Sequence, residues 1–168
     1  MKRYVFILLF LISAGLHAQQ GFKIGLNGGL PVSQEVNDIV SLVVGADVGY
    51  HYALGEVVDA GFMTGFINGF PEKFDSGGAD LPHVQFLPLA ASFRIWPSNS
   101  FSFGGDVGYA LGLNDGNDGG FYYKPLVGYL MGAQTEVSLS YTGIAVDELS
   151  WATVNLGVIY TFPERWRR

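Results

Sequence analysis

Histidine is the side chain most often used as a general base, and the chain carries His51 and His83 beyond its first eighteen residues. A hydrolase or acyltransferase that acts on lipids needs a nucleophile, usually Ser, within hydrogen-bond reach of such a base. His83 follows the stretch DSGGADLP, which contains Ser76 and Asp80, whereas His51 has no Ser at neighbouring positions on its own side of an extended segment. Nothing in either spacing requires these groups to meet. We therefore predict no catalytic residue and no enzymatic activity, and a lipid-modifying enzyme is a less favoured alternative.

Metal binding is the second chemistry to weigh, because Asp115 and Asp118 lie among glycines in the stretch NDGNDGG. Oxygen-rich loops bind calcium, but the ligand pattern that ends in a bidentate Glu is absent here. We predict a polar hairpin loop, with no metal and no cofactor. Other acidic residues between the strand-like segments would attract divalent cations without forming a specific site: Glu35, Asp38, Glu72, Asp75, Asp80, Asp147 and Glu148.

Isolated charged residues recur within segments that otherwise contain apolar and small residues. Three of them are basic and four are acidic, so their charges nearly balance: Lys23, Asp47, Asp59, Arg94, Asp106, Lys124 and Glu136. Charges removed from water must pair with one another or hold bound water. Which of these charges can pair therefore depends on how the segments that carry them are arranged.

Those segments show a period of two residues, whereas helical periodicity is hard to find. Each is close to, or somewhat longer than, the roughly 9–11 residues that a tilted strand needs to cross a bilayer. Clusters of Pro, Gly, Asn, Asp and Ser mark turns between them. The eight segments are residues 21–31, 40–54, 56–67, 84–96, 100–113, 120–131, 134–146 and 150–162.

The character of the two faces distinguishes a membrane barrel from a soluble one. In segment 40–54, bulky Val44 and Val48 lie on the face opposite Gly45 and Asp47. A soluble barrel turns its bulky face inward and covers its exterior with Lys, Glu and Arg. Here the face opposite the bulky side chains is mostly Gly, Ala, Ser and isolated charges. Such a face fits the narrow interior of an eight-stranded barrel, and the bulky face then meets lipid. We predict an all-β fold, an eight-stranded antiparallel up-and-down transmembrane β-barrel, over residues 19–162; a soluble secreted ligand-binding barrel is the least favoured alternative.

Connection lengths and aromatic residues agree with this fold. The connections alternate between long and short along the chain, as in outer-membrane barrels with short periplasmic turns and longer external loops. Aromatic residues near segment ends predict a girdle at each membrane interface. We expect the periplasmic girdle to contain Phe22, Tyr50, Tyr52, Trp96, Phe101, Tyr129, Tyr160 and Phe162, and the outer girdle to contain Phe66, Phe70, Phe121, Tyr123 and Trp151.

The N-terminus has the pattern of a secretory signal peptide. Lys2 and Arg3 precede an apolar run, small residues follow, and Ala18 marks the expected cleavage point, so we assign residues 1–18 to the signal peptide. With no Cys in the chain, lipid anchoring at that point and a disulfide-stapled fold are both excluded. Cleavage leaves 7 of the 9 basic residues against 15 acidic ones, a formal charge of −8. Such a chain is a poor nucleic-acid binder, because that function depends on Lys and Arg.

Within an eight-stranded barrel the seven isolated charges point inward. They would form either an ion or proton path or a salt-bridged plug, and the narrow lumen favours the plug. We predict an integral outer-membrane protein of a Gram-negative-type bacterium, with a closed lumen and a structural or cell-surface interaction role. A small pore, or an accessory barrel in transport or secretion, is the main alternative. The expected partner is outer-membrane lipid, with no nucleic acid; the chain is expected to be a monomer, and no external ligand is predicted.

The stretch FLPLAASFRIWPSNSFSFGGDVGYALGL resembles the central hairpin of the PorT-like outer-membrane β-barrel family, a group of small barrels of the OmpA–OmpX type. The matching features are Pro88 within the fourth segment, Arg94 near its end, and the glycine-rich run of residues 104–112. FKIGLNGGL and VNLGVIYTF are similar to the first and last strands of that family. The resemblance covers most of residues 21–162. It implies the barrel fold, but no biochemical activity, because members of the family mostly lack an assigned one.

The last segment also resembles the C-terminal signal by which the barrel assembly machinery recognises outer-membrane proteins. The residues that carry this likeness are Asn155, Gly157, Tyr160 and Phe162. The resemblance therefore implies the assembly machinery as a partner during biogenesis. Residues 163–168 follow the terminal aromatic residue, and we expect a short periplasmic tail that starts at Pro163, where strand pairing stops.

Overall fold

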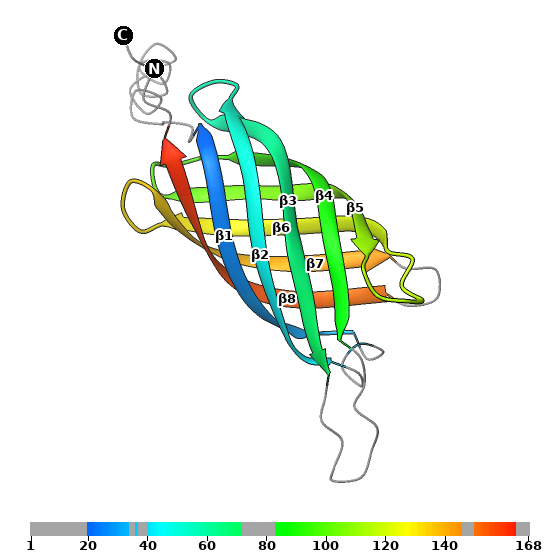
Figure 1. Cartoon of the computed structure of the whole chain (residues 1–168). Helices are drawn as coiled ribbons and strands as arrows, with labels where there is room; N and C mark the ends of the chain where they lie inside the picture. The colour runs from blue at the N-terminus through cyan, green and yellow to red at the C-terminus, as the bar shows by residue number, and fades with distance from the viewer. Residues whose placement is uncertain (1–19, 34–35, 37–39, 72–82, 146–149, 164–168) are drawn as a thin grey trace, which may run out of the picture.

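The computed structural model describes residues 20–33, 36, 40–71, 83–145 and 150–163. The proposed signal peptide and the residues beyond Pro163 lie outside this part of the chain. Eight strands form one closed antiparallel barrel in which each strand pairs with the next (Figure 1). The strands are β1 (Gly21–Pro31), β2 (Val40–Ala53), β3 (Val58–Pro71), β4 (Val84–Ile95), β5 (Phe101–Gly112), β6 (Gly120–Leu130), β7 (Thr135–Ala145) and β8 (Ser150–Pro163). The predicted fold class is confirmed.

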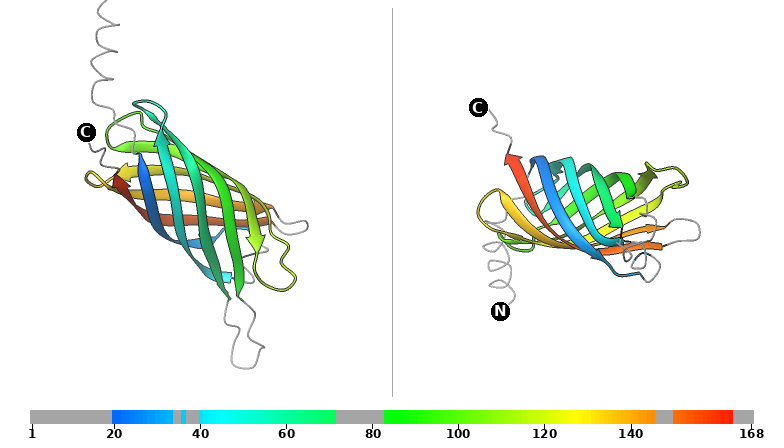
Figure 2. Two further views of the ribbon diagram at one scale, coloured as in Figure 1. Left: turned by 45° about the horizontal axis from the view of Figure 1, so that its top comes forward. Right: turned by 60° about the horizontal axis from the view of Figure 1, so that its bottom comes forward.

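The barrel closes where the first strand meets the last. β1 and β8 pair antiparallel from Gly21 opposite Pro163 to Pro31 opposite Thr153, so the start of β1 and the end of β8 lie side by side (Figure 2). The short turns at 54–57, 96–100 and 131–134 lie at this same end of the barrel. The connections at the opposite end are residues 32–39, 72–83, 113–119 and 146–149, and the first three are longer than any of these turns. We call these two ends the inner and the outer end.

Alternation of side chains gives the barrel an apolar exterior, as expected for a wall that faces lipid. Along β6, Phe121, Tyr123, Pro125, Val127 and Tyr129 are exposed on the outside, while the residues that alternate with them from Tyr122 to Gly128 are buried. Phe62 on β3 is 73% exposed. In the described residues, no helix is long and apolar enough to cross a membrane.

Seven strands agree with their predicted bounds to within one residue at each end, whereas β3 differs by more. β3 begins at Val58 and continues to Pro71, because Asn68 and Gly69 still pair with both β2 and β4; the sequence prediction ended this strand at residue 67. β8 includes Pro163, which still pairs with Gly21, so strand pairing does not stop at the predicted boundary.

Glycines allow close packing of neighbouring strands at particular positions on the wall. A Cβ on Gly108 would lie 2.7 Å from the Cα of Ala90 on β4, well inside van der Waals contact, whereas a Cβ on Gly28 would meet nothing closer than the Val43 carbonyl oxygen at 3.9 Å. The β4–β5 contact therefore depends on the missing side chain at position 108.

We expect Gly108→Ala to lower the free energy of unfolding by about 1–3 kcal/mol, because backbone atoms have to move to admit the methyl group. Urea titration of the refolded protein in phospholipid vesicles measures this change. Gly28→Ala is the matched control and should differ from the natural chain by no more than about 0.5 kcal/mol. Equal effects of the two substitutions would contradict the packing argument.

Candidate functional site in the barrel lumen

The lumen holds every charged side chain that the alternation places on the inward face. All of them are buried, with exposed fractions from 0% to 6%: Lys23, Asp47, Asp59, Arg94, Asp106, Lys124 and Glu136. They come from strands all around the barrel. Polar contacts divide them into three groups along the lumen.

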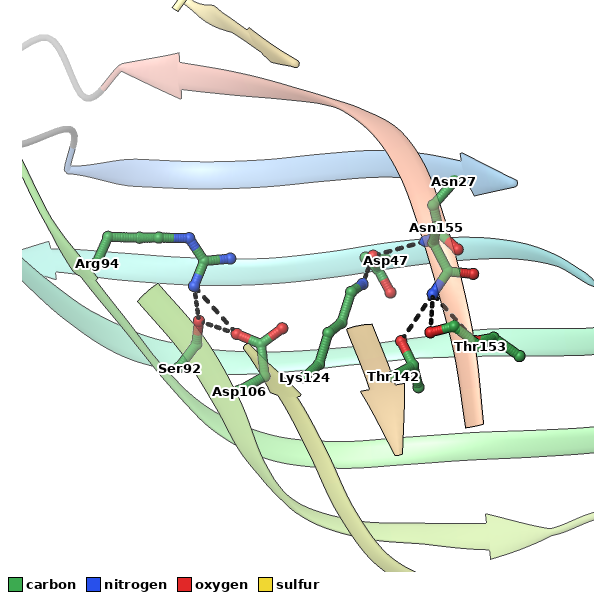
Figure 3. Close-up of polar contacts among 9 residues, drawn as sticks. All are labelled: Asn27, Asp47, Ser92, Arg94, Asp106, Lys124, Thr142, Thr153 and Asn155. Carbon is green, nitrogen blue, oxygen red and sulfur yellow. Dashed lines mark hydrogen bonds and ion pairs between the residues drawn. The ribbon is translucent and has the colours of Figure 1, made fainter. Parts of the chain in front are cut away.

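The first group joins neighbouring strands β4 and β5. Ser92 lies opposite Asp106 in the strand register, and the Ser92 hydroxyl donates a 2.5 Å hydrogen bond to Asp106 Oδ1. Arg94 Nη1 lies 3.2 Å from the same carboxylate oxygen and donates a 3.1 Å bond to Ser92 Oγ (Figure 3). Since Arg94 and Asp106 are each only 1% exposed, this ion pair is fully enclosed by the barrel.

The second group crosses the lumen. Lys124 Nζ on β6 lies 2.6 Å from Asp47 Oδ2 on β2, although these strands are not neighbours in the barrel. Asn27 Nδ2 on β1 donates a 2.9 Å bond to the same Asp47 oxygen (Figure 3). A lysine side chain that reaches from one wall to the other obstructs an axial path.

The third group lies toward the inner end. Trp96 Nε1 donates a 2.8 Å bond to Asp59 Oδ2, and the Lys23 ammonium lies 5.8 Å from the centre of the Trp96 ring, within cation–π range. Ser102 Oγ donates a 2.6 Å bond to Glu136 Oε1. His51, near Lys23 on the adjacent strand, is completely buried, and neither ring nitrogen has a hydrogen-bond partner within the described residues.

Trp96 corrects the predicted periplasmic girdle. It is 1% exposed and points into the lumen, not toward lipid. It lies two positions after Arg94, so both occupy the same face, and its backbone N–H donates to the carbonyl oxygen of Val57, just before β3. The alternation in the sequence therefore agrees with an inward position, whereas the girdle prediction followed from the place of Trp96 near the end of a segment.

Trp151 corrects the outer girdle in the same way. It is 5% exposed and packs edge-on against Phe86, with ring centres 5.2 Å apart and an interplanar angle of 69°. These rings belong to an apolar cluster that fills the outer part of the lumen, where the sequence prediction expected mostly small residues and isolated charges. Its buried members are Val36, Val40, Val43, Ile67, Phe86, Ala90, Ala110, Tyr122, Ile144 and Trp151.

A polar contact borders this apolar cluster. Asn155 Nδ2 on β8 donates 3.0 Å hydrogen bonds to the hydroxyl oxygens of Thr142 and Thr153 (Figure 3). Asn155 was assigned to the assembly signal, and here its side chain also links β7 and β8 inside the barrel. Of the other residues in that motif, Gly157 lies inside, whereas Tyr160 and Phe162 lie outside with their rings edge-to-face at 4.7 Å.

The arrangement offers no assembled catalytic or metal centre among the residues that the structure describes. No group of three or more His, Asp or Glu side chains could hold a metal ion there. His83 contacts Asn68 and Phe70 on β3, while Ser76 and Asp80, considered as its partners, lie outside the described residues. The seven acidic residues that were expected to attract cations, from Glu35 to Glu148, lie outside them as well.

Comparison with known proteins gives a structural likeness without a sequence relative. No family model matches the chain, and no curated protein matches its sequence. A structure of the Yersinia pestis outer membrane protein Ail in a phospholipid bilayer nanodisc matches with a TM-score of 0.60 and 15% identity, over 86% of this chain and 100% of that one. Ail in complex with the heparin analogue sucrose octasulfate matches with a TM-score of 0.52 and 14% identity, over 88% and 100%.

A de novo designed transmembrane β-barrel matches as well, with a TM-score of 0.55 and 11% identity, over 88% of this chain and 99% of that one. At these identities the likeness concerns the fold. The chain therefore has the closed eight-stranded fold of Ail-type outer-membrane barrels.

Proposed function

We propose that the mature chain is an integral outer-membrane protein whose closed barrel serves a structural or surface-interaction role, without enzymatic activity. The observation that carries this proposal is the contrast between the apolar exterior and the filled interior. The wall exposes aromatic and aliphatic side chains all round, whereas the lumen contains a Lys124–Asp47 pair across its width and apolar side chains around Trp151. A side chain that spans an eight-stranded lumen leaves little room for solutes.

Conductance in planar lipid bilayers tests this closure. We expect the refolded natural chain to give no steady single-channel current, because Lys124 reaches across the lumen and the side chains of Trp96 and Trp151 are buried inside it. Heat-modifiable migration in electrophoresis should first show that the sample is a folded barrel. A stable current from folded protein would favour the alternative function, a small pore or an accessory barrel in transport.

The connections at the outer end give the proposed surface its charge. They contain nine acidic residues, Glu35, Asp38, Glu72, Asp75, Asp80, Asp115, Asp118, Asp147 and Glu148, against the single basic residue Lys73. Ail has been solved with a sulfated ligand, but an acidic surface repels such a polyanion. We therefore propose an uncharged or cationic external partner for this chain.

We also propose that the end of β8 is recognised by the barrel assembly machinery, and that the chain is a divergent PorT-like barrel. The support for the first proposal is that Tyr160 and Phe162 are accessible on the outside at the inner end of the barrel. The Tyr160 hydroxyl contacts the Gln134 side chain in the adjacent turn, so the phenolic group lies at a polar edge. The proposal of a divergent PorT-like barrel is supported by the sequence motif around Pro88 and Arg94.

We expect Phe162→Ala to slow catalysed insertion more strongly than spontaneous folding, because it removes an accessible ring from the recognition motif. Insertion into proteoliposomes with and without the purified assembly machinery measures the difference. Phe22→Ala is the control, since Phe22 packs beside Phe162 at 6.1 Å but lies on the first strand. Equal slowing of both variants in both membranes would contradict recognition of the last strand.

A further inference from the structure

The outer wall of the barrel carries a groove of about 440 Å³ over β1, β2 and β3. Its shape follows from the strand register. Leu26, Ala46 and Phe66 lie side by side on three adjacent strands, so a small side chain separates two large ones. Val44 continues the floor toward the outer end and Phe70 forms part of the wall. The groove is therefore an apolar channel on the lipid-facing surface.

At its outer end this groove meets three polar side chains. Gln85 Nε2 on β4 donates a 3.0 Å hydrogen bond to Asn68 Oδ1 on β3, and Asn68 Nδ2 lies 3.4 Å from His83 Nδ1. Because an amide nitrogen only donates, this contact fits the His83 tautomer in which Nδ1 accepts and Nε2 carries the proton. The Phe70 ring lies 5.3 Å from the imidazole, nearly perpendicular to it. Asn68, His83 and Gln85 all line the groove.

These three side chains keep unused hydrogen-bonding capacity. Within the described residues, no contact uses His83 Nε2–H or Gln85 Oε1, and each amide NH2 group has a second hydrogen. A polar cluster on the lipid-facing wall is costly unless it has partners. A ligand that fits must therefore combine a hydrocarbon chain with a head group that both donates and accepts hydrogen bonds.

A second groove on the wall lacks the polar cluster of the first and provides a comparison. It has a volume of about 500 Å³ and is lined by Tyr50, Phe62, Leu89, Ala91 and other residues of β2 to β4. The hydroxyl of Thr64 in this groove donates a 2.9 Å hydrogen bond to the Pro88 carbonyl oxygen. The only hydrogen of that hydroxyl is therefore already used. This groove can accept a hydrocarbon chain, but it offers no comparable cluster to a head group.

We propose that the groove at Ala46 is a binding site for a glycolipid of the outer leaflet. One acyl chain lies along Leu26, Ala46 and Phe66, and hydroxyl or amide groups of an uncharged sugar head bond to Asn68, His83 and Gln85. The head is uncharged because the cluster has no charged side chain and the connections at this end are acidic, so an anionic head would be repelled. This site rests on the proposed insertion of the barrel in the outer membrane.

Dodecyl maltoside, which has one alkyl chain and an uncharged disaccharide head, is a suitable probe. We would titrate it into isotope-labelled full-length mature protein in dimyristoylphosphatidylcholine nanodiscs and follow NMR signals. We expect saturable shifts of the Asn68 and Gln85 side-chain amides together with the Ala46 methyl group. Heat-modifiable migration of the same sample tests insertion separately, so failure of the barrel and failure of the site are distinguishable.

Three variants distinguish a site from general solvation by detergent. Ala46→Phe fills the floor and should abolish saturation, whereas Ala91→Phe in the second groove should leave the binding curve unchanged. Replacing both Asn68 and Gln85 with Ala should weaken binding about tenfold, because two head-group hydrogen bonds are lost. The double variant keeps the apolar floor of the groove, so it still tests the binding site if Ala46→Phe does not fold.

The proposal is overturned if the Ala46 and Ala91 methyl groups shift alike and without saturation, or if Ala46→Phe folds and binds as the natural chain does. Dodecyl phosphate provides the test of the head group. We expect its binding to be several-fold weaker than that of the maltoside, and equal or tighter binding would refute the uncharged head.

Discussion

Replacing Lys124 with Met is expected to lower the free energy of unfolding by about 3–5 kcal/mol, because it leaves the Asp47 carboxylate as a buried charge without its counter-ion. Lys124 Nζ lies 2.6 Å from Asp47 Oδ2 in the natural chain, and the remaining partner of that oxygen, Asn27, is a neutral amide. Urea titration in phospholipid vesicles, followed by tryptophan fluorescence, measures the loss.

Two further variants distinguish loss of the pair from loss of a side chain. Replacing Asp47 with Leu together with Lys124→Met should recover most of the stability, since an apolar pair of similar size often substitutes well for a buried ion pair. Glu56→Gln, at an exposed position in the turn between β2 and β3, should change stability by no more than about 0.5 kcal/mol. If Lys124→Met is as stable as the natural chain, the pair does not hold the barrel together.

Replacing Trp151 with Ala is expected to cost about 3–5 kcal/mol, because it removes the largest side chain of the apolar cluster and leaves a cavity inside the barrel. The ring packs against Phe86 at 5.2 Å and lies directly over Gly69, where a Cβ would come within 2.6 Å of it. The walls of a closed barrel cannot collapse to fill the cavity. Equilibrium unfolding in vesicles measures the effect, with tyrosine fluorescence or circular dichroism as the signal.

Trp151→Phe provides the matched control, since it keeps an aromatic ring beside Phe86. We expect it to cost less than about 1.5 kcal/mol. Leu54→Ala, at an exposed turn position, should have little effect. If Trp151→Ala were no more destabilising than Leu54→Ala, the apolar cluster would not contribute to the stability of the barrel.

Sequence alternation was sufficient to predict the two faces of the wall. Asp106 and Val107 are adjacent in the chain, yet one is buried in the lumen and the other is exposed to the outside. Successive side chains of a strand point to opposite faces, so one assigned residue determines the sides of its neighbours. A bulge limits this reasoning near the start of β2, where Val40 and Val43 both point inward.

The lumen itself was predicted less well. Trp96 and Trp151 occupy the same faces as Arg94 and Thr153, so strict alternation would have placed both inside. The apolar cluster around Phe86 was missed because the interior was expected to hold mostly small residues and isolated charges. The groove at Ala46 was not foreseen either, since a hollow depends on the sizes of residues that adjacent strands place side by side.

The sequence alone determined the number of strands, their order and the inward or outward alternation within each regular stretch, because these follow from local periodicity and from the turns between segments. Only the closed tertiary structure decided which charges meet. Lys124 and Asp47 are 77 positions apart and lie on strands that share no hydrogen bonds. The pairing of β1 with β8 brings opposite walls within reach of one lysine side chain, and the depth at which each residue sits depends on the stagger of all eight strands together.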